Sequence, residues 1–474
     1  MAGRAVKRGS YVACGIGYSA GIHELCQHKL IINMFLGLKR DEWNWMHNFM
    51  LILFIFQLLL LVPGIGAVRI FTRIGSFGLS LYLLATINNK GINYPGKLPA
   101  YGIIAVLILS LCFNFNLNSI PAGLGQIAMY LAIIGPLFWG SKLPLSERGF
   151  RYLLMLIWAF QAVSAIFGLL QIYFPGQFQF QLSSVIENSV YGGQNLKIVL
   201  ANGASVFRPS GLTDQPGGAA SAGFYAILFG LAFFLEGKNK YLAGLGLLST
   251  FVGFFCIYMS QVRIILIAAC LCIFCLLIVL ALSLNFKRAL ALVGILQPLI
   301  LGTFGWAVAV GGASTLDRVT SLFAGSADQV YNQNRGAFLA QTIEELVPKY
   351  PWGAGLGRWG MINGYFGKNG NPFTDPIWVE IQWTGWLLDG GIPLIVAYSA
   401  ALIIACYVAI KIAFERRSDG LSFWGAVITA YNIGTIMITF NYPVFISQGG
   451  MEFWLLNTAI FVASFNYSVK QAKF

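Results

Sequence analysis

Histidine is scarce in this chain of 474 residues, and so are several motifs that carry common chemistry. The three histidines, His23, His28 and His47, come at or before the first long apolar segment, so the rest of the chain has no imidazole base or ligand. The sequence contains no HExxH, GxxxxGKS or DxD motif. These absences disfavour a soluble-type ATPase and a metal-clamped nucleotide-sugar transferase, and we expect no metal and no other cofactor.

Charged residues are also few. Only 10% of the residues are charged and 57% are hydrophobic, whereas soluble domains carry about 25% charged residues. Segments of about 20 apolar residues, enough to cross a hydrocarbon core of roughly 30 Å, recur from near residue 47 onward. The sequence predicts an all-α polytopic membrane protein with about twelve transmembrane helices. The predicted spans are approximately 47–65, 74–88, 98–114, 119–141, 151–174, 216–235, 241–259, 263–285, 289–311, 381–412, 420–440 and 442–467.

Cysteine forms no recognisable framework. Six of the eight cysteines fall inside the apolar spans, where they are expected to pack as small residues. The other two, Cys14 and Cys26, precede the first span. The pattern predicts neither a disulfide scaffold nor a cysteine metal site.

The basic residues divide unevenly between the two sides of the twelve-span arrangement. Twenty of the 30 lysines and arginines fall on the side that holds both termini, and the positive-inside rule makes this side cytoplasmic. The net charge of +13 therefore reflects membrane topology, and no nucleic-acid partner is expected. Residues 1–46 lack a signal-peptide pattern and predict either an interfacial helix or an unstructured cytoplasmic tail. Residues 47–474 then form a single transmembrane domain.

Two loops on the opposite, external side are long. They cover about residues 175–215 and 312–380. The second loop contains GAFLAQTIEELV, whose apolar residues recur near helical spacing, and a glycine-rich stretch follows. Long loops on rigid scaffolds commonly carry function. We expect short helices here that act as a lid or hold a substrate.

Four arginines stand at the edges of apolar segments or in these loops: Arg208, Arg263, Arg335 and Arg358. A guanidinium stays charged and pairs with phosphate through two parallel hydrogen bonds. The set predicts a cationic pocket for a lipid-linked phosphate or diphosphate. The alternative for each residue is that it anchors a helix end at the lipid headgroups.

A carboxylate follows the second long loop. Glu380 precedes the apolar stretch IQWTGWLLDGGIPLIV, and a desolvated carboxylate at this boundary is a candidate general base. Asp375 is the second candidate. The alternatives are a charge that favours a helix N-terminus for Glu380 and a turn residue before Pro376 for Asp375.

Aromatic residues are frequent in the same loop. Trp352, Trp359, Tyr365 and Trp378 offer flat faces on which sugar rings can stack, which suits a glycan ligand. Tryptophan and tyrosine also form the interfacial belt of any membrane protein, so both interpretations stay open.

The order of several short motifs resembles one family. The chain has RPSG at 208–211, SQVR at 260–263, Arg335 before an amphipathic segment, PWGAGLG at 351–357 and DGGIP at 389–393. This order resembles the O-antigen ligase and O-antigen (polysaccharide) polymerase superfamily of bacterial envelope glycosyltransferases. The resemblance covers roughly residues 200 to 395.

This resemblance implies a GT-C-like membrane glycosyltransferase of the bacterial inner membrane with its active site at the periplasmic or exterior face. The donor would be a glycan on undecaprenyl diphosphate, held by Arg208 and Arg263 with help from Arg335 or Arg358. Transfer to an acceptor glycan would be metal-independent and inverting. Membrane lipids would surround the protein. Whether a chain-length regulator is a further partner stays open.

Ligases of the family place a histidine at the start of the helix after the large loop, where this chain has Glu380. This departure favours a polymerase that joins repeat units. A ligase or O-oligosaccharyltransferase of the same superfamily is the alternative. A lipid-linked glycan flippase or another transporter is the alternative from a different class, although the charges here concentrate at one face.

Overall fold

The computed structural model describes residues 42–62, 66–114, 117, 119–180, 196–322, 329, 331, 335–368, 377–415 and 420–471. Every element described below belongs to the unit Asn44–Phe474. About 78% of the structure is helical, which confirms the predicted all-α class.

The elements follow the chain in a simple order. They are α2 (Trp45–Leu59), α3 (Gly66–Thr86), α4 (Lys97–Phe113), α5 (Ile120–Trp139), η2 (Gly140–Lys142), α6 (Glu147–Tyr173), α7 (Pro175–Phe178), β1 (Lys197–Val199), β2 (Ser205–Phe207), α10 (Gly218–Glu236), α11 (Lys240–Ser260), α12 (Arg263–Leu282), α13 (Phe286–Thr320), α15 (Ala337–Gln341), η4 (Thr342–Leu346), α16 (Val347–Lys349), α17 (Gly360–Phe366), α18 (Gln382–Phe414), α19 (Leu421–Ile438), η5 (Val444–Ile446) and α20 (Gln448–Gln471).

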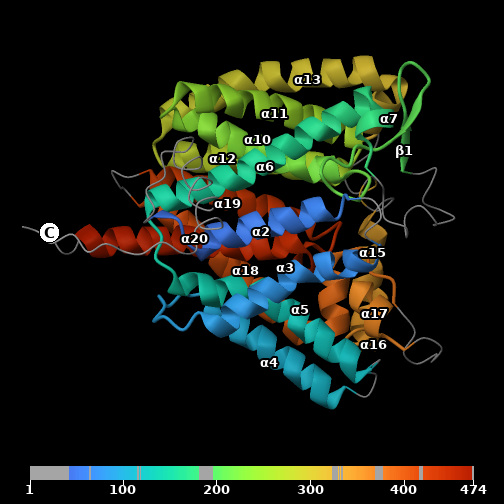
Figure 1. Cartoon of the computed structure of the whole chain (residues 1–474), viewed down its shortest axis with the longest axis vertical. Helices are drawn as coiled ribbons and strands as arrows, with labels where there is room; N and C mark the ends of the chain where they lie inside the picture. The colour runs from blue at the N-terminus through green and yellow to red at the C-terminus, as the bar shows by residue number, and fades with distance from the viewer. Residues whose placement is uncertain are drawn as a thin grey trace, which may run out of the picture. The chain divides into compact units, whose positions relative to one another are not determined.

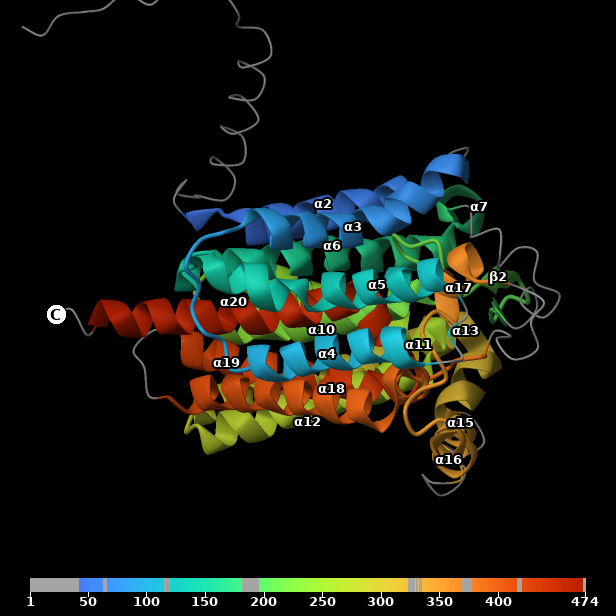
Figure 2. The ribbon, with the colours of Figure 1, turned by 90° about the horizontal axis from the view of Figure 1, so that it is seen from below.

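Each predicted span overlaps one of these helices. Among the described residues, eight helices are long and apolar enough to cross a membrane, and α2 and α4 are shorter apolar helices. Long helices run side by side through the bundle in both ribbon views (Figure 1, Figure 2). These findings support a multi-pass membrane protein, while the count of twelve spans stays a prediction.

Glycines let neighbouring helices approach closely. A Cβ atom on Gly230 of α10 would lie 2.5 Å from the backbone oxygen of Gly246 in α11, so no other residue fits there without a shift. Gly223 and Gly253 form a similar contact two helical turns away. Small residues at helix contacts are the usual means by which membrane helices pack, because lipid gives helices no hydrophobic reason to associate.

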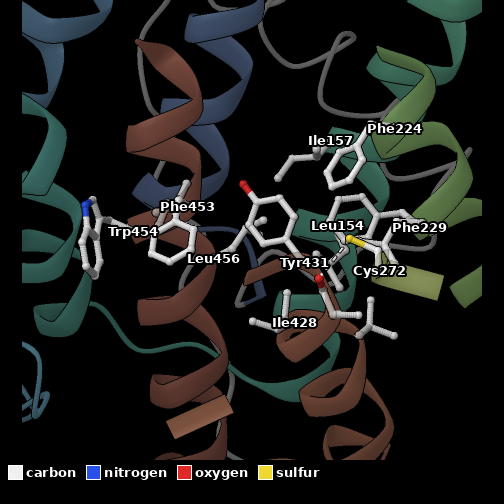
Figure 3. Packing of buried hydrophobic residues seen from close by; sticks show 14 of the residues in the cluster. Leu154, Ile157, Phe224, Phe229, Cys272, Ile428, Tyr431, Phe453, Trp454 and Leu456 are labelled. Carbon is white, nitrogen blue, oxygen red and sulfur yellow. Dashed lines mark hydrogen bonds between the residues drawn. The ribbon is translucent and has the colours of Figure 1, made fainter. Parts of the chain in front are cut away.

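The core of the bundle is rich in aromatic side chains. Tyr431 of α19 packs between Phe229 of α10 and Phe453 of α20, with ring centroids 6.1 Å apart in both pairs (Figure 3). Trp454 lies against Phe453 at 4.9 Å in an edge-on arrangement. These contacts tie α10, α19 and α20 together.

Several short elements gather at one end of the bundle, which we call the loop end. It carries α7, the strands β1 and β2, and α15 to α17 (Figure 2). The two strands form an antiparallel hairpin in which Ile198 pairs with Val206. The helix expected within GAFLAQTIEELV is present as α15, η4 and α16, and it continues through Pro348 to Lys349. The sequence did not predict the hairpin.

Candidate anion-binding site

The loop that carries Arg208 is held by buried hydrogen bonds. It follows β2, and the side-chain oxygen of Gln171 in α6 accepts from the backbone N–H groups of Ser210 at 2.8 Å and Gly211 at 2.9 Å. Gly211 has a φ of +61° and lies against Ser164, so this turn requires glycine. The backbone around Arg208 is therefore rigid.

The same loop is fixed to its surroundings at its far end. Asp214 forms an ion pair with Arg73 of α3 at 2.5 Å. The N–H of Gly217 donates to the Arg208 carbonyl at 3.4 Å, and the N–H of Ala219 donates to the Pro209 carbonyl at 3.2 Å. These bonds place Arg208 beside the first turn of α10.

Arg263 opens α12 close to this turn. It follows Gln261, whose φ of +54° reverses the chain between α11 and α12. A Cβ on Gly217 would lie 3.3 Å from the Val262 side chain, so the first turns of α10 and α12 are neighbours. The Arg263 side chain donates from Nη2 to Ser321 Oγ at 2.5 Å. This bond links the start of α12 to the end of α13.

A third arginine, Arg318, completes the site. Its Nε donates to the Gln261 carbonyl at 3.4 Å, and the charges of Arg263 and Arg208 are both close enough to act on it. Arg318 lies beyond a break in α13 at Gly312, where φ is +60° and the backbone packs on Ala201. We call Arg208, Arg263 and Arg318 the arginine cluster.

The electrostatics of the cluster favour an anion. Burial lowers the pKa of Arg208, and its Nε is buried without a hydrogen-bond partner among the described residues. Within the same residues, neither Arg208 nor Arg318 pairs with a carboxylate. The side chains of Arg208, Arg263 and Arg318 are each partly buried. Like charges that are partly shielded from water repel one another until a counter-charge arrives. The N-termini of α10 and α12 add positive dipole ends, so the arrangement suits an anion such as a phosphate group.

Arg335 has a different partner. It forms an ion pair with Glu380, the candidate base, just before α18. Trp378 also donates its indole N–H to Glu380 Oε1 at 2.6 Å. The hydroxyls of Thr342 in η4 and Thr384 in α18 are 2.6 Å apart. The structure thus joins two predicted site residues, Arg335 and Glu380, to each other, and η4 contacts α18.

Arg358 is packed inside the glycine-rich turn. It is 4% exposed, and its Nη1 donates to the Ala354 carbonyl at 3.0 Å. The turn enters the break in α18, where the N–H of Ala354 donates to the Leu388 carbonyl and the N–H of Ile392 donates to the Pro351 carbonyl. Arg358 therefore stabilises the turn, and the described contacts do not join it to the arginine cluster.

Asp389 is a buried carboxylate whose contacts the sequence did not reveal. Its Oδ2 accepts from Gln126 at 2.9 Å and Tyr130 at 2.7 Å in α5, and its Oδ1 accepts from the Trp359 indole at 2.9 Å. All three donors are neutral, and Asp389 is fully buried. The sequence could have indicated the importance of Asp389, because an aspartate inside an otherwise apolar membrane helix usually has a specific role.

The aromatic residues predicted to stack on a glycan differ in how much of each side chain is exposed. Trp352 is 75% and Trp378 76% exposed, and Tyr365 is 41% exposed, so their rings are accessible. Trp359 is 3% exposed and bonded to Asp389, so its ring packs inside the protein and offers no face to a glycan. Asp375, the second candidate base, lies outside the described residues.

Comparison of the chain with protein-family models found no match, and comparison with curated protein sequences found none either.

Proposed function

We propose that this protein is a membrane-embedded glycosyltransferase that uses a glycan carried on a polyprenyl diphosphate. The observation that supports the proposal most is the arginine cluster at the loop end. Three guanidiniums from separate parts of the chain, together with two helix N-termini, match the charge and the hydrogen-bonding oxygens of a diphosphate. The sequence resemblance supports the same substrate class, with undecaprenyl diphosphate as the carrier.

The proposed reaction is an inverting transfer. An acceptor hydroxyl oxygen attacks the anomeric carbon, the bond to the diphosphate oxygen breaks, and the diphosphate leaves with the electron pair. Negative charge grows on the leaving group as this bond breaks. Fixed guanidiniums therefore bind the transition state more tightly than the ground state, which is the origin of their contribution to the rate.

Glu380 is the proposed general base that receives the acceptor proton. Its ion pair with Arg335 holds the carboxylate just before the first turn of α18. The bond from Trp378 orients the same carboxylate. The exposed rings of Trp352, Tyr365 and Trp378 are proposed to contact the glycan.

The proposed product is a longer glycan made by joining repeat units, at the exterior face of a bacterial inner membrane with both termini cytoplasmic. A ligase or O-oligosaccharyltransferase differs only in the acceptor. A lipid-glycan flippase is the second candidate, and one observation favours it. Glu452 of α20 is buried inside the bundle, and a buried carboxylate within a membrane helix is a common feature of transport pathways.

The purified protein in vesicles, supplied with an undecaprenyl-diphosphate-linked repeat unit, should convert single units into a ladder of longer chains. Glu380→Gln should lower this rate by about 10²- to 10⁴-fold, because a glutamine cannot accept the proton. The measurement is the rate of chain lengthening on a gel.

Glu345→Gln is the matched control. Glu345 is an exposed carboxylate on the same external segment, where it contacts Gln341, so its replacement should leave the rate unchanged. A Glu380→Gln variant as fast as the wild type would remove Glu380 from the reaction. Movement of intact units between leaflets without any ladder would favour the flippase.

A further inference from the structure

One ion pair involves the loop that carries Arg208 and has no role in the proposed reaction. Arg73 of α3 donates from Nη2 to Oδ2 of Asp214 at 2.5 Å. Asp214 belongs to the loop that begins at Arg208 and ends at the start of α10. The Asp214 side chain is 7% exposed and the Arg73 side chain is 26% exposed. Because the pair is largely shielded from water, its attraction is stronger than that of an exposed pair.

Asp214 is a potential competitor for Arg208. It is the one acidic residue within residues 196–217 of the sequence. The loop folds back on itself, since the N–H of Gly217 donates to the Arg208 carbonyl at 3.4 Å. A carboxylate within such a closed loop is a natural counter-ion for the guanidinium at its start. A pair between Asp214 and Arg208 would offset the positive charge that an anionic ligand needs.

The structure gives these two side chains different partners. Asp214 pairs with Arg73, whereas no ion pair joins Arg208 to a carboxylate among the described residues. The Nε of Arg208 is buried there without a hydrogen-bond partner. The pair with Arg73 draws the carboxylate toward α3, while Arg208 acts together with Arg263 and Arg318 of α12 and α13. The loop thus contains a carboxylate and a guanidinium that do not neutralise each other.

Three helices hold the chain around Asp214. The N–H of Leu212 donates to Ser164 Oγ of α6 at 2.9 Å, and the Leu212 carbonyl accepts from Gln57 of α2 at 3.0 Å. The helices α2 and α3 run side by side (Figure 2), and Arg73 of α3 adds the third attachment. Neutral hydrogen bonds therefore fix the backbone before Asp214, and the charge of Arg73 offsets that of the carboxylate.

A second arginine on the same helix has a different contact. Arg69 lies one helical turn before Arg73, and its Nη2 donates to the Leu60 carbonyl at the end of α2 at 3.3 Å. Asp214 pairs with Arg73 and not with Arg69. The two arginines therefore share a helix and a charge but differ in their contact with the Arg208 loop, which makes Arg69 a matched control.

We propose that Arg73 is a positioning residue for the diphosphate site. It holds the carboxylate of Asp214, so that the guanidinium of Arg208 stays available to the anionic ligand. Arg73 acts through Asp214 and does not contact the ligand. This inference rests on the proposed function, which assigns a diphosphate to the arginine cluster.

The test is equilibrium binding of geranyl diphosphate to folded, full-length protein in detergent. Arg73→Ala should weaken binding by about 10- to 100-fold, because the released carboxylate of Asp214 then pairs with a guanidinium of the cluster. Asp214→Asn breaks the same ion pair but leaves no carboxylate, so its affinity should stay within about threefold of the wild type. Adding Asp214→Asn to Arg73→Ala should restore the affinity to a similar level, since the effects of residues in contact are not additive.

Two outcomes would overturn the proposal. Equal losses in Arg73→Ala and Asp214→Asn would mean that the ion pair only anchors the loop. A double variant as weak as Arg73→Ala would mean that Arg73 binds the ligand itself. Arg73→Lys keeps the charge beside Asp214 and should bind like the wild type. Arg69→Ala removes an equal charge from the same helix and should change the affinity by less than about threefold, because solvent and salt screen a distant charge.

The same measurements separate this inference from the proposed function, because binding needs no turnover. A protein that shows the predicted rescue but never makes a ladder would contradict the glycosyltransferase function while the role of Arg73 stands. A protein that makes a ladder but shows no rescue would contradict the role of Arg73 and leave the function standing. A wild-type protein that binds no geranyl diphosphate would contradict both.

Discussion

Alanine in place of Arg263 should nearly abolish chain lengthening. The substitution removes one of three guanidiniums that face the proposed diphosphate and breaks the bond that joins the start of α12 to Ser321. In the proposed complex, Arg263 and the diphosphate form a charge pair that is shielded from water. Loss of one member of such a pair costs about 2–5 kcal/mol, which corresponds to roughly a 30- to 4,000-fold loss of rate. The measurement is the initial rate of ladder formation in vesicles at equal protein level.

Arg318→Ala should have an effect of similar size, and this variant is the sharper test because the motif pattern does not mark Arg318. Arg288→Ala is the matched control. It removes a guanidinium from the first turn of the same helix, where Arg288 lies 4.5 Å from the Phe423 ring, far along α13 from the cluster. If Arg318→Ala and Arg288→Ala kept the same rate, the cluster would have no role in substrate binding.

The second large effect concerns stability. Asp389→Ala removes the acceptor of three buried hydrogen bonds, from Gln126, Tyr130 and Trp359. Each buried donor left without a partner costs about 1–3 kcal/mol, so the loss should be roughly 3–9 kcal/mol. A domain is stable by only about 5–15 kcal/mol, so we expect little folded protein. The measurement is the folded yield and the melting temperature in detergent.

Asp389→Asn is the comparison for this prediction. Its side-chain oxygen can still accept hydrogen bonds, but its amide nitrogen faces a donor, so the melting temperature should fall between those of the wild type and Asp389→Ala. Asp317→Ala, at an exposed position near the end of α13, should leave the melting temperature unchanged. A wild-type melting temperature for Asp389→Ala would mean that the three contacts do not hold the turn in place.

Apolar length made the helices predictable from the sequence. Twenty-residue apolar segments must form helices in lipid, because every backbone N–H and C=O needs an internal partner there. Each predicted span accordingly overlaps a helix. The breaks at Gly312 and Gly391 escaped prediction, since each depends on a glycine of positive φ that packs against a distant segment. The β1–β2 hairpin, whose turn contains Gly203, also escaped prediction.

The site was predictable only in part, because tertiary contacts decide which of its residues come together. Arg208 and Arg263 stood out because each begins or precedes an apolar segment, whereas Arg318 sits in a helix end that looks like an ordinary interfacial anchor. The sequence offered no sign that Arg335 would pair with Glu380, because loop residues are separated along the chain by segments whose folding brings them together. Trp359 and Arg358 looked like loop residues that face a ligand, yet both are buried in the turn at α18.

The most direct test of the central claim is equilibrium binding of geranyl diphosphate, compared with geranyl monophosphate, to the purified full-length protein. The arginine cluster predicts tighter binding of the diphosphate, with affinity that falls as salt rises and that is lost in the Arg208→Ala, Arg263→Ala double variant. Equal affinity for the two ligands, or diphosphate binding that survives the double substitution, would contradict the account.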